Sequence, residues 1–192
     1  MNRLRIIAPL ALVTLLAGCM PPLELRSHTY DRDRVPDRLL VVQTMMYTVR
    51  EPKVSNGFKT EIARLLDACG VPTAFSVNNE TPGKSLFAGD TVAPYADVET
   101  DKINELKPNF VLSVRELTTT TQGTITIVDM EAVLTDRVRK KPVWRANGFI
   151  RKTPLLNRVT LEDFARALVD KMRTDNILRT CPASLDSSPK KG

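Results

Sequence analysis

The sequence predicts a single α/β domain with a mixed sheet, in the order β-α-β-α-β-β-β-α and with the helices mainly on one face. Its 192 residues are the length of one domain. Leu39-Leu40-Val41-Val42 is a short, β-branched-rich run, typical of a strand buried on both faces. An amphipathic helix follows it, and three strand-like segments joined by short links come later, which indicates antiparallel pairing.

The first half of the domain has the pattern of a βαβ unit. We expect a strand at 38–47, and Ser55-Asn56-Gly57 is interpreted as a turn that can cap the next helix. A second strand is expected at 71–78, so the helix would be the crossover between two parallel strands. One face of that helix carries apolar residues at spacings of 4, 3, 1 and 3, namely Phe58, Ile62, Leu65, Leu66 and Cys69.

The second half continues with a long loop after residue 78, a short helix at 98–106 and strands at 110–117, 124–136 and 143–150. In the middle strand Ile125 and Ile127 lie on one phase, and the other apolar residues lie on the opposite phase. This conflict predicts a bulge, or a sheet covered on both faces. The last helix opens with Thr160-Leu161-Glu162-Asp163, close to a capping box. Its apolar face consists of Leu161, Phe164, Leu168 and Met172.

Residues 1–18 have the composition of a secretory signal. Arg3 and Arg5 precede an apolar run, 6–16, and small residues follow it. The run of about eleven residues is too short to cross a hydrocarbon core of about 30 Å as a helix. The alternative of a buried core helix has no support, because the run is not amphipathic.

The segment Leu16-Ala17-Gly18-Cys19 resembles the lipobox of bacterial lipoproteins. The resemblance implies cleavage before Cys19 and acylation of both its thiol and its new amine. Three acyl chains would hold the protein on a membrane essentially permanently. Met20 stands where an aspartate would favour inner-membrane retention, so the resemblance implies the outer membrane, facing the periplasm.

The mature chain divides into a flexible tether at 19–37, a globular domain at 38–181 and a disordered tail at 182–192. The tether is predicted from Pro21-Pro22 and from the charged run Asp31-Arg32-Asp33-Arg34. The formal charge of the whole chain is +6, and loss of Arg3 and Arg5 leaves 26 basic against 22 acidic residues, or +4. This mild excess does not indicate a nucleic-acid partner.

No candidate catalytic centre or cofactor site emerges from the residue pattern. Thr81-Pro82-Gly83-Lys84-Ser85 matches the end of a phosphate-binding loop, but Asn78 stands where that motif needs glycine. The single histidine, His28, lies in the predicted tether, and the remaining thiols are too few for a zinc site. We therefore expect a protein that is not an enzyme and that binds no metal or nucleotide.

Two segments are candidate partner-binding sites. Arg139, Lys140 and Lys141 lie in a basic turn, which is either a solvated hairpin that protects a sheet edge or a contact for anionic lipid, lipopolysaccharide or an acidic protein. Phe87 and Tyr95 lie in the loop 79–97, whose length is typical of functional loops. They either contact a partner or hold the loop down. Trp144 is in phase with Ala146 and Ile150, which favours core packing.

The order of these elements, together with Pro108-Asn109-Phe110-Val111-Leu112-Ser113-Val114 and the strand entering Val143-Trp144, resembles small periplasmic lipoproteins of the CsgG, LpoB and TolB-N-terminal-like class. The turn at 137–142 departs from the Thr-Gly-Lys turn common in that class. The resemblance implies a non-enzymatic role in recruiting or supporting envelope components. The alternative is a transport auxiliary in which the sheet and the loop 79–97 enclose a lipid or another small ligand.

Cys69 and Cys181 are predicted to form a disulfide. Once Cys19 is acylated they are the two thiols left, in a compartment that oxidises such pairs. Each follows a helix, so their approach requires those two helices to lie side by side. The alternative is a buried free thiol at Cys69 and a frayed tail that carries Cys181.

Overall fold

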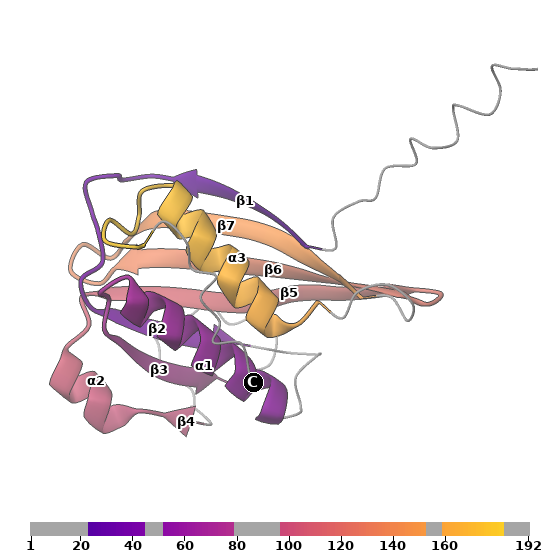
Figure 1. Cartoon of the computed structure of the whole chain (residues 1–192), viewed down its shortest axis with the longest axis horizontal. Helices are drawn as coiled ribbons and strands as arrows, with labels where there is room; N and C mark the ends of the chain where they lie inside the picture. The colour runs from indigo at the N-terminus through magenta and orange to yellow at the C-terminus, as the bar shows by residue number, and fades with distance from the viewer. Residues whose placement is uncertain (1–22, 45–51, 79–96, 153–158, 183–192) are drawn as a thin grey trace, which may run out of the picture.

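The computed structural model describes residues 23–44, 52–78, 97–152 and 159–182. Figure 1 shows its seven strands and three helices within these ranges. In chain order they are β1 (Leu23–Thr29), β2 (Leu39–Thr44), α1 (Pro52–Ala68), β3 (Thr73–Asn78), β4 (Asp97–Val98), α2 (Thr100–Leu106), β5 (Phe110–Gln122), β6 (Ile125–Asp136), β7 (Lys141–Lys152) and α3 (Leu161–Thr174).

All seven described strands form one mixed sheet in the order β1-β7-β6-β5-β2-β3-β4. β2 pairs in parallel with both β3 and β5, and α1 connects β2 to β3, so the predicted βαβ unit is confirmed. β5, β6 and β7 form the predicted antiparallel run. The predicted order of elements is present, with β1 and the two-residue β4 added to it.

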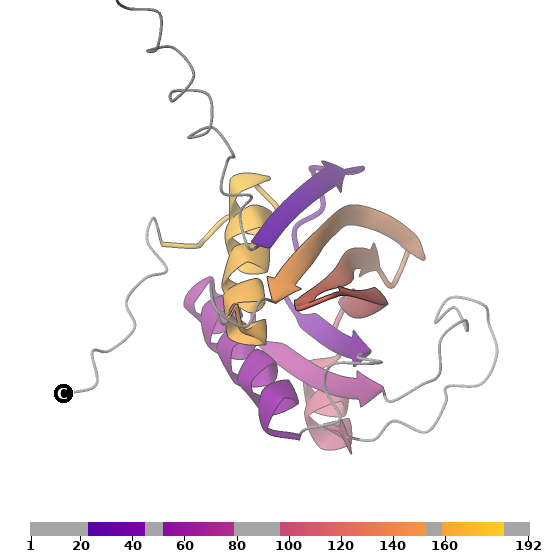
Figure 2. The same cartoon turned by 90° about the vertical axis from the view of Figure 1, so that its right-hand side faces the viewer.

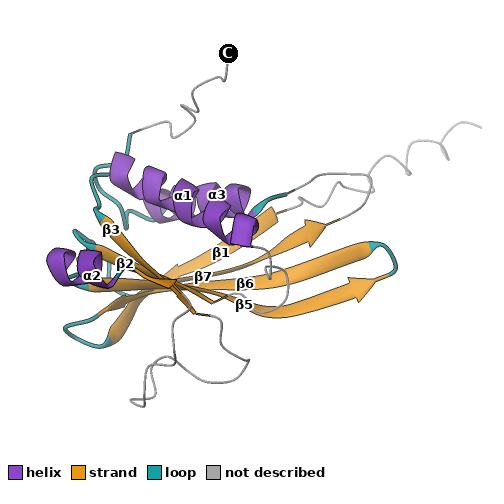
Figure 3. Ribbon diagram, turned by 90° about the horizontal axis from the view of Figure 1, so that it is seen from below, coloured by secondary structure: helices purple, strands orange, loops and turns teal. Residues whose placement is uncertain are grey.

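The helices α1 and α3 lie side by side on one face of the sheet, as Figures 2 and 3 show, while α2 lies beside β3 at its edge. The ring centroids of Phe58 on α1 and Phe164 on α3 are 6.4 Å apart. The apolar face predicted for each helix is buried against the strands. Trp144 is fully buried in this core, as predicted.

The predicted tether at 19–37 is wrong for the part that the structure describes, because it contains β1. All seven residues of β1 pair antiparallel with β7. Leu23 and Leu25 pack against the core, while Glu24 and Arg26 alternate with them on the opposite face. An edge strand needs only a few apolar side chains when its partner strand supplies the hydrogen bonds, so the charged composition was a poor guide.

Two helix starts test the capping predictions. α1 begins at Pro52, so Ser55, Asn56 and Gly57 lie inside the helix and the predicted turn is wrong. Proline suits a first helical turn because the N–H that it lacks would have no partner there. At α3 the capping box is confirmed: the Thr160 hydroxyl accepts from the Asp163 N–H, and the Asp163 carboxylate accepts from the Thr160 N–H.

The two apolar phases of the middle strand lie on the two faces of the sheet, because β6 alternates along its length without a skipped residue. The predicted bulge is present in the neighbouring strand β5 and not in β6. The register between β5 and β6 shifts between Glu116 and Thr118, which leaves Leu117 unpaired. Ile125 and Ile127 lie in the half of β6 beyond this bulge, on the face away from α1 and α3, and are half-buried. β5 also runs to Gln122, further than the predicted 117, so β5 and β6 form a long hairpin.

Candidate functional site

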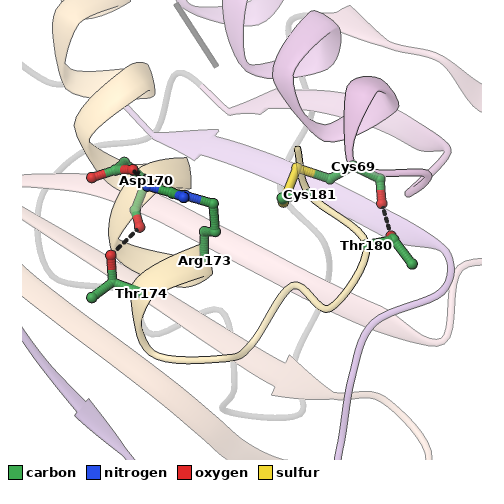
Figure 4. The surroundings of a disulfide bond; sticks show 6 residues. All are labelled: Cys69, Asp170, Arg173, Thr174, Thr180 and Cys181. Atoms are coloured by element: carbon green, nitrogen blue, oxygen red, sulfur yellow. Dashed lines mark hydrogen bonds and ion pairs between the residues drawn. A yellow bond between two sulfur atoms is a disulfide. The ribbon is translucent and has the colours of Figure 1, made fainter. Parts of the chain in front are cut away.

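The disulfide predicted between Cys69 and Cys181 is present, and it joins the end of α1 to the segment after α3 (Figure 4). Cys69 is fully buried. The hydroxyl of the neighbouring Thr180 donates to the backbone carbonyl of Cys69. Between α3 and the bridge, Ile177 and Leu178 are buried in the core. The disulfide therefore fixes a chain segment that packs across the ends of both long helices.

The base of the basic turn is a buried carboxylate, Asp136. Its Oδ2 accepts from Arg34 at 2.6 and 3.0 Å, and its Oδ1 accepts the backbone N–H groups of Val138 at 2.9 Å and Arg139 at 3.0 Å. Burial raises the pKa of Asp136, but the N–H of Arg139, the Arg34 guanidinium and the N–H of Val138 outweigh it and hold the pKa below its ordinary value. The turn is thus organised by one ionised side chain.

The side chains predicted to bind a partner at this turn have different surroundings. The Arg139 guanidinium pairs with Asp31 at 3.2 Å and is half exposed. For Lys140 and Lys141 the described part of the chain offers no ion pair, and Val138 beside them is 78% exposed. A hollow of about 560 Å³ adjoins the turn. Its lining consists of Tyr30, Asp31, Asp136, Arg139, Lys141, Pro142 and Val143.

The sheet face opposite α1 and α3 carries a second charged group. Glu131 on β6, buried, accepts from Arg115 on β5 and pairs with Arg145 on β7 at 3.4 Å. Next to it lies an open groove of about 430 Å³ between β1 and β5. Leu117 and Phe149 supply apolar side chains to its lining, and Leu117 is 39% exposed. The ion pairs of Glu131 and the groove therefore both lie on the sheet face that the described helices leave uncovered.

The other residues singled out in the sequence lie away from the turn and the groove or outside the described ranges. Cys19, Phe87, Tyr95 and the segment 81–85 lie outside the described residues. His28 lies on β1, with its ring 4.5 Å from the ring of Tyr30. Within the described ranges, no cluster of three or more His, Cys, Asp or Glu side chains could hold a metal, and no helix has the length and apolar character to cross a membrane.

The sequence did not indicate that Tyr30 and Asp31 lie beside the basic turn, or that Asp136 organises it. Asp31 lies 108 residues from Arg139, so no local pattern connects them. One signal was present: Asp136 directly precedes a basic turn, where aspartate commonly accepts backbone N–H groups.

Comparison with known proteins gives similar folds only. No protein-family model matches the chain, and neither does any curated protein. Among solved structures, the PelC dodecamer from Paraburkholderia phytofirmans is 20% identical over 82% of this chain and 99% of that chain, with a TM-score of 0.44. The lipoprotein GNA1162 from Neisseria meningitidis is 21% identical over 72% and 99%, with a TM-score of 0.41. A minor lipoprotein from Acinetobacter baumannii is 11% identical over 72% and 94%, with a TM-score of 0.32.

Proposed function

We propose that this chain is a periplasmic lipoprotein, anchored to the outer membrane through Cys19, that recruits or supports other cell-envelope components and catalyses no reaction. The observation that carries the proposal is the lipobox-like Leu16-Ala17-Gly18-Cys19, followed after three residues by the edge strand β1. A domain attached this closely is held at the membrane surface, where a supporting or recruiting role requires it.

The disulfide between Cys69 and Cys181 supports export. Stable disulfides form in oxidising compartments, such as the bacterial periplasm, and are rare in the cytosol. The pairing also leaves no free thiol other than Cys19 in this chain of three cysteines, so the acyl group has one possible cysteine.

The basic turn is the candidate contact for a partner protein because of where it lies along the sheet. Leu23 pairs with Ile150, and β7 runs nine residues from there back to Lys141, about 30 Å along the strand. The turn is therefore at the far end of the sheet from the start of β1 (Figure 1). At that distance an acidic periplasmic protein is a better fit for Lys140 and Lys141 than lipid headgroups.

The anchor is tested by Cys19→Ser with labelled palmitate and cell fractionation. The natural chain is expected to incorporate palmitate and to fractionate with outer membrane, and the variant to do neither. Palmitate in the variant, or an unlabelled natural chain, would contradict the proposal. Alanine at Ser27 is a suitable control, because it leaves the lipobox-like segment unchanged.

The partner contact is tested by reversing charge at Arg139, Lys140 and Lys141 together and crosslinking in cells. The expected result is loss of a crosslinked envelope protein at unchanged thermal stability. Lys102→Glu with Lys107→Glu, on or next to exposed α2, is the control for charge reversal elsewhere on the surface; it changes the net charge by −4, against −6 in the turn variant. If the turn variant keeps every crosslink and the phenotype, the basic turn is only a solvated hairpin.

A lipid- or small-ligand-binding role is the second candidate, and the groove beside Leu117 and Phe149 favours it. The groove is open, and its apolar side chains Leu117 and Phe149 suit one acyl chain lying along the sheet, with Glu24, Arg26 and Asp129 in the rest of its lining. Native mass spectrometry of the purified protein separates the two roles. Copurified lipid that is lost in Phe149→Ala supports ligand binding, and a protein free of lipid supports the recruiting role.

A further inference from the structure

The end of the sheet that carries the tip of the β5–β6 hairpin is also the end where β1 starts (Figures 1 and 3). Leu23 pairs with Ile150 of β7, Ile150 pairs with Val128 of β6, and Val128 pairs with Thr119 of β5. β6 extends three residues further, to Ile125, or about 10 Å past the level of Leu23. The turn around Gly123 adds to this projection.

The distance from the anchor to the start of β1 is limited by the chain itself. Cys19 and Leu23 are four residues apart, so even a fully extended segment spans at most about 14 Å. This limit is close to the projection of the hairpin past Leu23. With Cys19 at the bilayer surface and the strands directed toward it, the hairpin tip reaches the headgroup region.

The composition of the hairpin fits this location. The twelve residues from Leu117 to Val128 carry no charge, and threonines, a glutamine and two isoleucines make up most of them. Hydroxyl and amide groups can hydrogen-bond to headgroups, and apolar side chains enter the interface at low cost, whereas charged groups resist burial there. The opposite end of the sheet carries Arg137, Arg139, Lys140 and Lys141 in its turn.

A basic side chain lies beside the apolar part of the hairpin. Arg151 on β7 pairs with Ile127 in the register and shares its sheet face. The residue is partly exposed, and within the described structure its buried Nε has no hydrogen-bond partner. A guanidinium in this position can bind the phosphate of an anionic lipid.

We propose that the tip of the β5–β6 hairpin, from Thr119 to Ile127, rests on the lipid surface together with Arg151, so that the domain stands with its basic turn facing away from the membrane. The proposal depends on the proposed anchor at Cys19 and adds a defined orientation to it. The occupant of this surface is a phospholipid headgroup layer with anionic lipid in it.

The test uses the acylated full chain in vesicles of phosphatidylethanolamine with some phosphatidylglycerol, with and without brominated acyl chains. Thr124→Cys places one free thiol at the tip for the fluorophore NBD, because Cys19 is acylated and the other two cysteines are bridged. Val138→Cys, at the opposite end of the sheet, is the matched control. We expect blue-shifted emission and strong quenching by brominated lipid at residue 124, and aqueous, unquenched emission at residue 138.

Equal quenching at both positions would mean that the domain lies flat, and quenching at residue 138 alone would mean the reverse orientation. Either result, or two unquenched probes, overturns the inference. Intact mass and vesicle flotation of the same samples distinguish a wrong orientation of the domain from failure of the anchor. An acylated protein that floats with vesicles but keeps residue 124 in water contradicts the orientation only, whereas a protein without acyl groups contradicts the proposed function.

Discussion

The indole Nε1 of Trp144 donates a 2.7 Å hydrogen bond to Oδ2 of Asp175, and this contact joins β7 to the residue that ends α3. Burial raises the pKa of Asp175, but hydrogen bonds from Ser27, Trp144 and Lys171 outweigh burial and lower the pKa overall. Because Ser27 belongs to β1, one carboxylate connects the last helix to the two outermost strands on this side of the sheet.

We expect Trp144→Phe to lower the free energy of unfolding by about 2–4 kcal/mol, measured by urea denaturation at neutral pH. The phenyl ring leaves a cavity, and the loss of a hydrogen bond to a charged acceptor adds to the cost. Asp175→Asn is the informative companion, because its amide oxygen can still accept from the indole; a loss nearer 1 kcal/mol is expected. Equal losses in both variants would show that the charge of Asp175, rather than the packing of Trp144, dominates.

Asp136 should make the stability of the folded protein depend on pH in the acid range. Its pKa in the folded protein is below the ordinary value of 3.8, so the unfolded state binds more protons in that range and stability rises with pH. The contribution of Asp136 is complete above pH of about 4 and is lost as pH falls through its lowered pKa. Asp136→Asn should therefore be less stable at neutral pH by about 2–3 kcal/mol, since Arg34 loses its ionised acceptor.

The measurement compares urea denaturation of the natural chain and Asp136→Asn from neutral to acid pH. The difference between the two should shrink below pH of about 4. Arg139→Ala is the control: it keeps the backbone N–H that Asp136 accepts and removes only a half-exposed ion pair with Asp31, so it should cost less than about 1 kcal/mol. A constant difference across the pH range would contradict the assignment of the charge effect to Asp136.

The sequence predicts the parts of this fold that depend on local periodicity. β2, α1 and α3 follow from apolar spacing, and the capping box at Thr160 from four consecutive residues. β1 was missed because only Leu23 and Leu25 mark it, and its stability comes from pairing with β7, more than a hundred residues away. Pro21-Pro22 and the charged run after β1 gave a stronger local signal for a tether.

The candidate site was predictable to a similar degree. The cysteine pair was identified because few thiols remain once Cys19 is assigned to acylation. Arg139, Lys140 and Lys141 were found as a charge cluster. The ion pairs that shape the turn, Arg139 with Asp31 and Arg34 with Asp136, join residues far apart in the chain and leave no sequence pattern. Phe87 and Tyr95 stay predictions.

Gly148 permits the close approach of β1 to β7. A Cβ atom at this position would lie 2.1 Å from the backbone oxygen of Glu24 and 2.5 Å from Cδ2 of Leu25. The first of these atoms belongs to the backbone, so β1 itself would have to move. We expect Gly148→Ala to destabilise the domain by about 1–3 kcal/mol and to raise hydrogen exchange at the amides that join β1 to β7.

Gly123 provides the matched control, because a Cβ there meets nothing within 4 Å and its positive φ of 60° is one that asparagine tolerates. Gly123→Asn should cost less than about 1 kcal/mol and leave exchange in β1 unchanged. If hydrogen exchange in β1 is as slow in Gly148→Ala as in the natural chain, the close packing of β1 on Gly148 does not stabilise the pairing of β1 with β7. A released β1 would also lengthen the connection between Cys19 and the domain.

Replacing Cys69 and Cys181 by serine together should lower the free energy of unfolding by about 4–5 kcal/mol, the range that chain entropy gives for a loop of 112 residues. The loss of hydrogen-exchange protection should be largest at Ile177 and Leu178, because the bridge holds their segment against the core.

Thiol labelling of the denatured mature protein checks the bond directly: no cysteine should react before reduction and two should react after it. Cys181→Ser alone is the control, with one reactive thiol in both conditions. Two reactive cysteines in the unreduced natural protein would mean that Cys69 is a buried free thiol and that the segment after α3 is held by apolar packing alone.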